Sequence, residues 1–262
     1  MPEKKPVIVA VANQKGGIGK TTTAVAMASI LNKLGHKTLL IDADQQANAS
    51  NTFQAAVENT ATLYDVLLDR KPVPLKEAIQ HTQYSDVVAG DPLLAKGDAE
   101  LSKSVEGLFL MQEALKDIDD YEFVVIDTPP ALGEMMKSVL IAADEVIIPV
   151  TADSFSIDGL KSEVAAINAI KKRLNPKLTI RGLVLIAYPI NTKLGEIVKK
   201  HLEETASSLG TDVLWPPIRR TIRVEEAHFA GMPVIYYDES CTAAQDYIEL
   251  IQNFLEVHYG KK

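Results

Sequence analysis

The sequence has almost no cysteine: Cys241 is the only one in 262 residues. A single thiol cannot form a disulfide within the chain, and it cannot supply a cysteine-based metal cluster. The histidines are spread through the chain without the spacing of metal ligands: His36, His81, His201, His228 and His258. These absences exclude a disulfide framework, and they are typical of a protein of the reducing cytosol.

Long apolar runs and an excess of basic charge are also missing. No stretch approaches the roughly 18 consecutive apolar residues that a membrane-spanning helix needs, and residues 1–6 are short and charged, unlike a signal peptide. The chain has 35 acidic and 27 basic residues and a formal net charge of −8. The overall field therefore does not attract nucleic acid, and DNA binding would need a local basic patch. We expect a cytoplasmic protein.

The sequence is rich in apolar runs of strand length, which alternate with longer helical patterns. This alternation predicts an α/β fold with a mostly parallel twisted sheet and helices on both faces. We expect one domain over residues 1–262, because no linker or repeat interrupts the pattern. The predicted strands are Val7–Ala12, Lys37–Ile41, Asp86–Ala89, Phe123–Ile126, Glu145–Pro149 and Thr179–Ala187. The predicted helices run from the glycine-rich loop to Leu34 and over Leu63–Leu68, Glu100–Lys116, Ile157–Leu174, Lys193–Leu209 and Ala243–Val257.

A glycine-rich stretch, residues 13–23, lies between the first predicted strand and the first predicted helix. A strand, a tight turn and a helix N-terminus together form a phosphate cradle, because backbone amides and the helix dipole face the anion. In such a loop Lys20 reaches the β- and γ-phosphates and the Thr21 hydroxyl holds Mg²⁺. Gln14 stands where the general pattern has glycine, and Lys15 is a second lysine inside the loop. We call this stretch the phosphate loop and interpret it as a nucleotide site.

The run Lys15-Gly16-Gly17-Ile18-Gly19-Lys20-Thr21 resembles the deviant Walker A loop of the ParA/MinD P-loop ATPases, in particular the small Soj-like ParA partition proteins. The resemblance implies ATP and Mg²⁺ as cofactors, and it implies that Lys15 reaches the partner's nucleotide within an ATP-bound homodimer. The ATP-binding residues it implies are Lys15, Gly16, Gly17, Ile18, Gly19, Lys20, Thr21, Thr22, Ile218 and Arg220.

Acidic residues end two of the predicted strands, where ligands of open α/β sheets bind. Asp127 precedes a Pro-Pro turn and looks like a Walker B residue that orders Mg²⁺, together with Thr21. Residues 42–50 are similar to the family's first switch segment, and we use that name for them. The resemblance implies that Asp42 supports Mg²⁺ and that Asp44 positions the attacking water, so Lys15, Lys20 and Asp44 are the implied catalytic residues. Gln45 replaces the family's proline, which leaves the backbone angle there less fixed. We predict slow hydrolysis.

Residues 218–227, here called the basic segment, contain Arg219, Arg220 and Arg223 in an acidic protein. The segment resembles the part of ParA proteins that contributes to non-specific DNA binding. A second arginine of the family falls at Asn191 and is missing, although Lys193 lies close by in sequence. The alternative is a solvated, ion-paired helix start, because Glu225 and Glu226 follow the arginines.

The resemblance implies a partition ATPase whose ATP dimer binds double-stranded DNA non-specifically and is released by a ParB-like, centromere-binding stimulator. We therefore expect a nucleoid-associated protein, and we expect no N-terminal helix-turn-helix domain because the phosphate loop begins near the first residue. A MinD-like membrane-positioning ATPase is the alternative, but residues 246–257 are acidic on their polar side, so we expect no stable membrane association. A metabolic P-loop ligase or kinase, and a ParA-like protein that positions protein cargo, also remain open.

Overall fold

The protein contains one eight-stranded sheet with the strand order β3-β4-β2-β5-β1-β6-β7-β8. The computed structural model describes residues 5–152, 154–190 and 192–260. All neighbouring strands pair in parallel except β3, which runs antiparallel to β4. The strands are β1 (Val7–Val11), β2 (Thr38–Asp42), β3 (Ile79–His81), β4 (Asp86–Val88), β5 (Phe123–Asp127), β6 (Glu145–Thr151), β7 (Thr179–Ile186) and β8 (Val213–Leu214). The predicted α/β fold with a mostly parallel sheet is confirmed.

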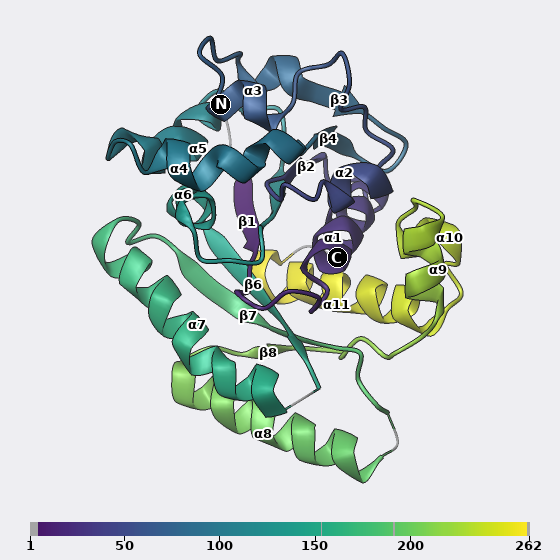
Figure 1. Ribbon diagram of the computed structural model, residues 1–262. Helices are drawn as coiled ribbons and strands as arrows, with labels where there is room; N and C mark the ends of the chain where they lie inside the picture. Colours follow the sequence, from purple (N-terminus) through teal and green to yellow (C-terminus); the bar gives the residue numbers. More distant parts are fainter. Residues whose placement is uncertain (1–4, 153, 191, 261–262) are drawn as a thin grey trace.

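Helices cover both faces of this sheet (Figure 1). One core lies between the sheet and helices α3 to α8, and the other lies under α1, α2 and α9 to α11. Alternate residues of β1 enter the two cores, because successive side chains of a strand point to opposite faces. The helices are α1 (Lys20–Lys33), α2 (Asn48–Thr52), α3 (Leu63–Leu67), α4 (Gly97–Leu101), α5 (Leu110–Ala114), α6 (Glu134–Ala142), α7 (Ser154–Arg173), α8 (Lys193–Leu209), α9 (Arg223–Phe229), α10 (Val234–Tyr237) and α11 (Thr242–Tyr259).

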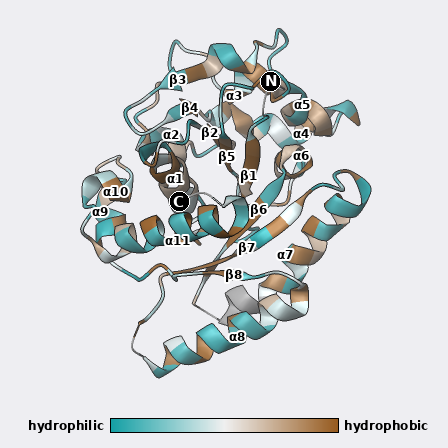
Figure 2. Ribbon diagram, turned by 180° about the vertical axis from the view of Figure 1, so that it is seen from behind, coloured by the Kyte–Doolittle hydropathy of each residue, from teal (hydrophilic) through white to brown (hydrophobic). Residues whose placement is uncertain are grey.

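The hydropathy of the chain follows these layers. Figure 2 shows largely hydrophobic strands at the centre, whereas α8 and α11 alternate between hydrophilic and hydrophobic stretches. Such alternation is expected of helices that bury one side and expose the other. All six predicted strands are present to within a residue or two, and α8 has the predicted bounds.

The predicted helix over Glu100–Lys116 is wrong as a continuous element. The chain forms α4, a 3₁₀ turn η3 (Glu106–Phe109) and α5 instead. The cause is a tight reversal in which a Cβ on Gly107 would lie 2.2 Å from the carbonyl oxygen of Leu101. Only glycine fits so close to another backbone, and this approach shows that the chain folds back here instead of continuing as a helix.

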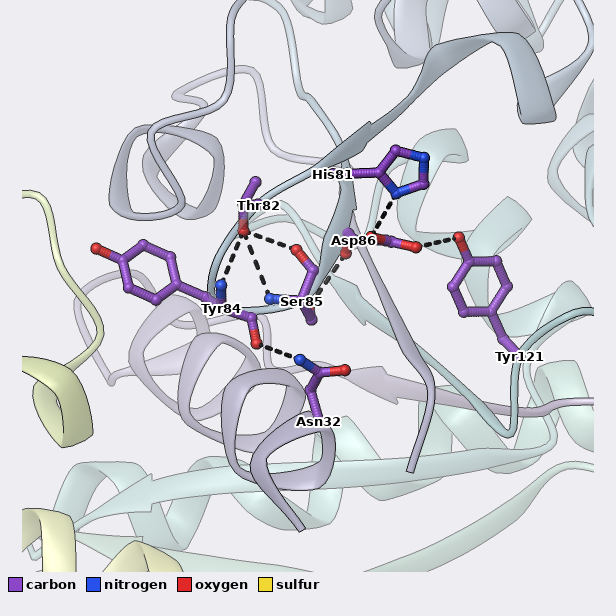
Figure 3. A network of polar contacts seen from close by, with 7 residues as sticks. All are labelled: Asn32, His81, Thr82, Tyr84, Ser85, Asp86 and Tyr121. Atoms are coloured by element: carbon purple, nitrogen blue, oxygen red, sulfur yellow. Dashed lines mark hydrogen bonds and ion pairs between the residues drawn. The ribbon is translucent and has the colours of Figure 1, made fainter. Parts of the chain in front are cut away.

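Strand β3 and its antiparallel pairing with β4 were not predicted, because β3 is only three residues long. Polar side chains hold the connecting turn (Figure 3): the Thr82 hydroxyl donates to Ser85 O at 2.7 Å, and Asn32 Nδ2 of α1 donates to Tyr84 O at 3.0 Å. The Tyr121 hydroxyl donates to Asp86 Oδ2 at 2.6 Å. The contacts from Asn32 and Tyr121 come from distant parts of the chain, so local sequence patterns do not reveal them.

Candidate functional site

The phosphate loop leaves β1 at Val11 and enters α1 at Lys20. Gly17 and Gly19 have φ angles of +71° and +73°, in the left-handed region that side chains disfavour. A Cβ on Gly19 would also lie 2.5 Å from Ile186 Cδ1. The loop therefore requires glycine at these positions. It stands at the N-terminus of a 14-residue helix, where an anion is stabilised by free amides and the helix dipole.

The entrance of the loop is tied to two other elements. Asn13 Nδ2 donates to Pro149 O of β6 at 2.9 Å, and Asn13 Oδ1 accepts from Lys15 N at 2.9 Å. Gln14 N donates to Glu163 Oε2 of α7 at 2.9 Å. Glu163 is only 4% exposed, and its second oxygen is buried without a hydrogen bond from the described residues. Sequence reasoning missed Glu163, because a single acid in an amphipathic helix carries no local signal.

This contact predicts a role for Glu163 in nucleotide binding. A Glu163→Ala variant is expected to weaken ADP binding about tenfold, since a hydrogen bond to a charged group contributes about 1.5–3 kcal/mol. Glu163→Gln keeps an acceptor for Gln14 N and is expected to bind ADP almost as tightly as the parent. Titration of a fluorescent ADP analogue measures both affinities. Equal weakening in the two variants would contradict the assignment to this hydrogen bond.

Lys20 is buried at the base of the loop, and its Nζ donates to Lys15 O at 3.0 Å. Burial lowers the pKa of Lys20, whereas the carboxylates of Asp127 and Asp44 oppose this change. The ammonium group therefore lies among acids at the position where an incoming phosphate needs a cation.

The two predicted magnesium acids meet through the register of the sheet. Asp42 ends β2 and Asp127 ends β5, and the two are direct partners across the strands. Val11, the last residue of β1, is paired with Asp127 on its other side. Both acids therefore lie beside the start of the phosphate loop, at the carboxyl edge of the sheet where ligands of such folds bind.

The first switch segment closes around Asp42. Asp42 Oδ2 accepts from Ser50 N at 2.8 Å and from Ser50 Oγ at 2.7 Å, and Asp44 N donates to Oδ1 at 3.2 Å. Burial raises the pKa of Asp42 to about 6, and the bonds from Ser50 counteract this rise. Ser50 Oγ in turn accepts from Gly90 N at 2.8 Å. Asp44 follows in the chain and lines the cleft described below.

Asp127 has the surroundings of a cation ligand. Both of its oxygens are buried, and neither accepts a hydrogen bond of normal geometry from a described residue. Burial and then the neighbouring Asp42 raise its pKa well above the usual range, although the Thr21 hydroxyl acts in the opposite direction. The described residues contain no group of three His, Cys, Asp or Glu that could hold a metal alone. Magnesium suits this arrangement, because it needs few protein carboxylates when phosphates and water complete its shell.

A cleft of about 790 Å³ opens above the loop, a size typical of small-ligand sites. Most of the predicted ATP residues line it: Gly16, Gly17, Gly19, Lys20, Thr21, Thr22, Ile218 and Arg220. Ile18 is buried in the core instead, and Lys15 is exposed at the front of the loop. Thr22 makes a 3.0 Å hydrogen bond with His228, a cleft residue that the sequence did not reveal.

The basic segment also lines the cleft and then enters α9. Arg219 is oriented by Asp246 of α11, with Nη2 donating to Oδ1 at 2.7 Å. Arg220 is exposed and has no ion pair with any described residue. Arg223 pairs with Glu226 at 2.7 Å and Asp238 at 3.4 Å. The position of Arg223 is therefore compatible both with an ion-paired helix start and with a contact to DNA.

Lys193 is exposed at the first turn of α8 and does not line the cleft. The preceding loop approaches the basic segment, since Tyr188 N donates to Ile218 O at 2.9 Å. Asn191 lies outside the described residues. The described helices include none long and apolar enough to cross a membrane.

The sequence is similar to partition proteins over nearly its whole length. Residues 6–180 match the family model of an AAA domain. The chain is 34% identical over 252 residues to the chromosome partitioning protein ParA of Caulobacter vibrioides, covering 95% of this chain and 93% of that protein. It is 33% identical to the sporulation initiation inhibitor protein Soj of Bacillus subtilis, covering 93% of this chain and 96% of that protein.

Solved structures share the same architecture. Cobyrinic acid a,c-diamide synthase from Mycobacterium smegmatis, with an ATP analogue and magnesium bound, superimposes with a TM-score of 0.82 at 26% identity, covering 98% of each chain. A McdA variant from Cyanothece in complex with ATP gives a TM-score of 0.85 at 22% identity, covering 99% of this chain and 98% of that one. The second likeness concerns the fold alone.

Proposed function

Because the chain belongs to the ParA/Soj family of P-loop ATPases, we propose that it is a partition ATPase that binds Mg²⁺-ATP in the cleft and hydrolyses it slowly. The phosphate loop supports this proposal with its left-handed glycines, its buried Lys20 and its position beside two acids. Lys20 and the loop amides hold the β- and γ-phosphates.

In this proposal different residues of the chain bind magnesium, hold the first switch segment and orient the attacking water. Thr21 and Asp127 hold magnesium, and Asp42 supports its shell while keeping the first switch segment in place through Ser50. Bound magnesium neutralises negative charge on the transferring phosphoryl group. Asp44 lines the cleft and orients the attacking water. Catalysis then consists of positioning and charge stabilisation, as for phosphoryl transfer in general.

We further propose that ATP joins two copies of the chain face to face. Lys15 is exposed at the front of the loop rather than lining its own cleft, which supports a role toward the partner's nucleotide. When Lys15 of each copy contacts the ATP phosphates of the other copy, dimerisation depends on ATP. The phosphates supply the negative charge that the Lys15 ammonium group needs at the interface. Lys15 acts catalytically in this arrangement by stabilising charge on the transferred phosphate.

The continuity of the basic segment is the observation that carries the DNA-binding proposal. Ile218 and Arg220 line the nucleotide cleft, and Arg223 begins the helix that follows directly. Arg219, Arg220, Arg223 and Lys193 are the proposed DNA contacts. The proposed contacts to the nucleotide and to the DNA phosphates thus lie in one continuous stretch of chain. Nucleotide binding in the cleft can therefore change the position of the arginines.

The expected affinity explains why a dimer is needed. A few cations give a non-specific DNA affinity of only about 10⁻⁴ to 10⁻⁶ M at physiological salt. Joining two patches in one dimer strengthens binding by about 10²- to 10⁴-fold when both engage the same DNA. ATP hydrolysis, stimulated by a DNA-bound ParB-like partner, then releases the protein by separating the two patches.

The packing of the C-terminal helix α11 favours binding to DNA over binding to a lipid surface. The apolar side of α11 is buried in the core through residues that include Tyr247, Leu250 and Phe254. A membrane-binding amphipathic helix needs a free apolar side. We therefore propose no stable membrane association, in contrast to a MinD-like protein.

The decisive experiment measures binding to a random-sequence DNA duplex with ATP, with ADP and without nucleotide, across a salt series. We expect ATP-dependent binding that weakens steeply with salt and is lost in Lys20→Ala and Arg223→Glu. Arg173→Glu is the matched control, because Arg173 is an exposed arginine at the end of α7. ATP-dependent dimers without DNA binding in any state would overturn the partition function, and anionic liposomes and protein cargo would then be tested.

A further inference from the structure

Helix α9 is held to the body of the protein by few contacts. Among its seven residues only Ala227 is buried, and Phe229 at its end is 97% exposed. A helix with so little buried apolar surface is readily shifted, because few packing contacts oppose its movement. Arg223, the first residue of this helix, is one of the proposed DNA contacts.

Two hydrogen bonds link this helix region to the parts of the site that face the phosphates. His228 Nε2 lies 3.0 Å from Thr22 Oγ1, in the first turn of α1. Gly231 O, just beyond the helix, accepts from Gln54 Nε2 at 3.2 Å. Gln54 lies two residues after α2, the helix that carries Ser50 and thereby holds Asp42.

The cleft brings a bound nucleotide against the same helix. Thr22, Val224, Glu225 and His228 all line it, so the cleft wall is shared by the start of α1 and by α9. The loop and the residues just after it surround the α- and β-phosphates in P-loop proteins. A nucleotide that extends from the loop toward Ile218 therefore passes the Thr22–His228 pair.

We propose that His228 is a positioning residue that transmits nucleotide occupancy from Thr22 to helix α9 and so sets the position of Arg223. This inference rests on the proposed nucleotide site and adds a route from that site to the basic segment. Gln54 makes the second link, from the residues just after α2 to Gly231 just beyond the same helix. Nucleotide binding thus fixes α9 through two contacts, one at His228 within the helix and one at Gly231 just beyond its end.

Hydrogen–deuterium exchange with and without Mg²⁺-ADP tests this route independently of DNA. In the parent, ADP is expected to slow exchange in residues 16–24 and in residues 219–231. In His228→Leu, protection of residues 16–24 is retained, whereas exchange of residues 219–231 becomes about 3- to 10-fold faster than in the ADP-bound parent, the effect of one ordinary hydrogen bond. His228→Gln can still bond Thr22 and is expected to behave as the parent does.

His201→Leu is the matched control, because His201 is an exposed histidine on α8 away from the cleft. Gln54→Ala tests the second link if His228→Leu does not fold, and it is expected to lose part of the same protection. Parent-like protection of residues 219–231 in His228→Leu, or no protection of them in the parent, would overturn the proposal. Failure of ADP to protect residues 16–24 in the parent would instead overturn the nucleotide site itself.

Discussion

An Asp44→Ala variant is expected to hydrolyse ATP about 100-fold more slowly than the parent, or slower still, because a positioned carboxylate at the attacking water contributes at least that factor. ATP binding is expected to persist, since Asp44 lines the cleft but is not among the proposed phosphate-binding groups, which are the loop amides and Lys20. The variant therefore accumulates as an ATP-bound dimer. Single-turnover hydrolysis and light scattering in the presence of ATP measure the two effects.

Asp69→Ala is the control for Asp44→Ala, because Asp69 is an exposed acid outside the cleft. The carboxylate of Asp44 also accepts from Gln46 N at 3.0 Å, so Asp44→Asn separates loss of this bond from loss of charge. We expect Asp44→Asn to keep the loop in place and still to hydrolyse slowly. Turnover at the parent's rate in either Asp44 variant would exclude this residue from the mechanism.

Asp127→Asn is expected to stabilise the nucleotide-free protein and to abolish its stabilisation by Mg²⁺-ADP. Burial raises the pKa of Asp127 well above its usual range, so the folded protein pays for the ionised form at pH values above that pKa. An uncharged side chain removes this cost, and a gain of about 1 kcal/mol corresponds to a rise in Tm of about 2–4 °C for a chain of this size. Loss of the carboxylate also removes the proposed magnesium ligand.

Thermal unfolding across a pH series measures both effects of Asp127→Asn. The raised pKa means that the cost is complete at pH values above it and declines as the pH falls from it toward the ordinary pKa of an aspartate, so the difference in Tm between variant and parent shrinks on acidification. Asp69→Asn serves as the exposed control. A variant that keeps its response to Mg²⁺-ADP would contradict the assignment of Asp127 as a ligand, and a variant that is less stable than the parent without nucleotide would contradict the cost of the buried charge.

The sequence predicts those parts of the fold that depend on interactions between residues close to one another in the chain. The capping box at Thr62 is one example, since Thr62 N donates to Asp65 Oδ2 at 2.8 Å and α3 begins at the next residue. The phosphate loop is another, because its glycines and lysine act within a few residues of one another. The central strands are predicted for the same reason, as continuous apolar runs of strand length.

The parts that sequence reasoning misses depend on contacts between distant segments. Glu163 reaches Gln14 from 149 positions away, and His228 reaches Thr22 from 206 positions away. Neither residue stands in a recognisable motif, so only the folded chain reveals its place. The break at Gly107 is similar in kind, because it follows from the close approach of the Leu101 carbonyl rather than from helix propensity.

The pairing of Asp42 with Asp127 depends more on the number of residues in β2 and β5 than on which apolar residues these strands contain. Because side chains alternate between the two faces of a strand, removal of one residue within β2 or β5 would turn the acid at its end to the opposite face of the sheet. Exchange among valine, isoleucine and leucine leaves this parity unchanged. Exchange of one apolar residue for another within these strands is thus expected to disturb the site less than insertion or deletion of a single residue.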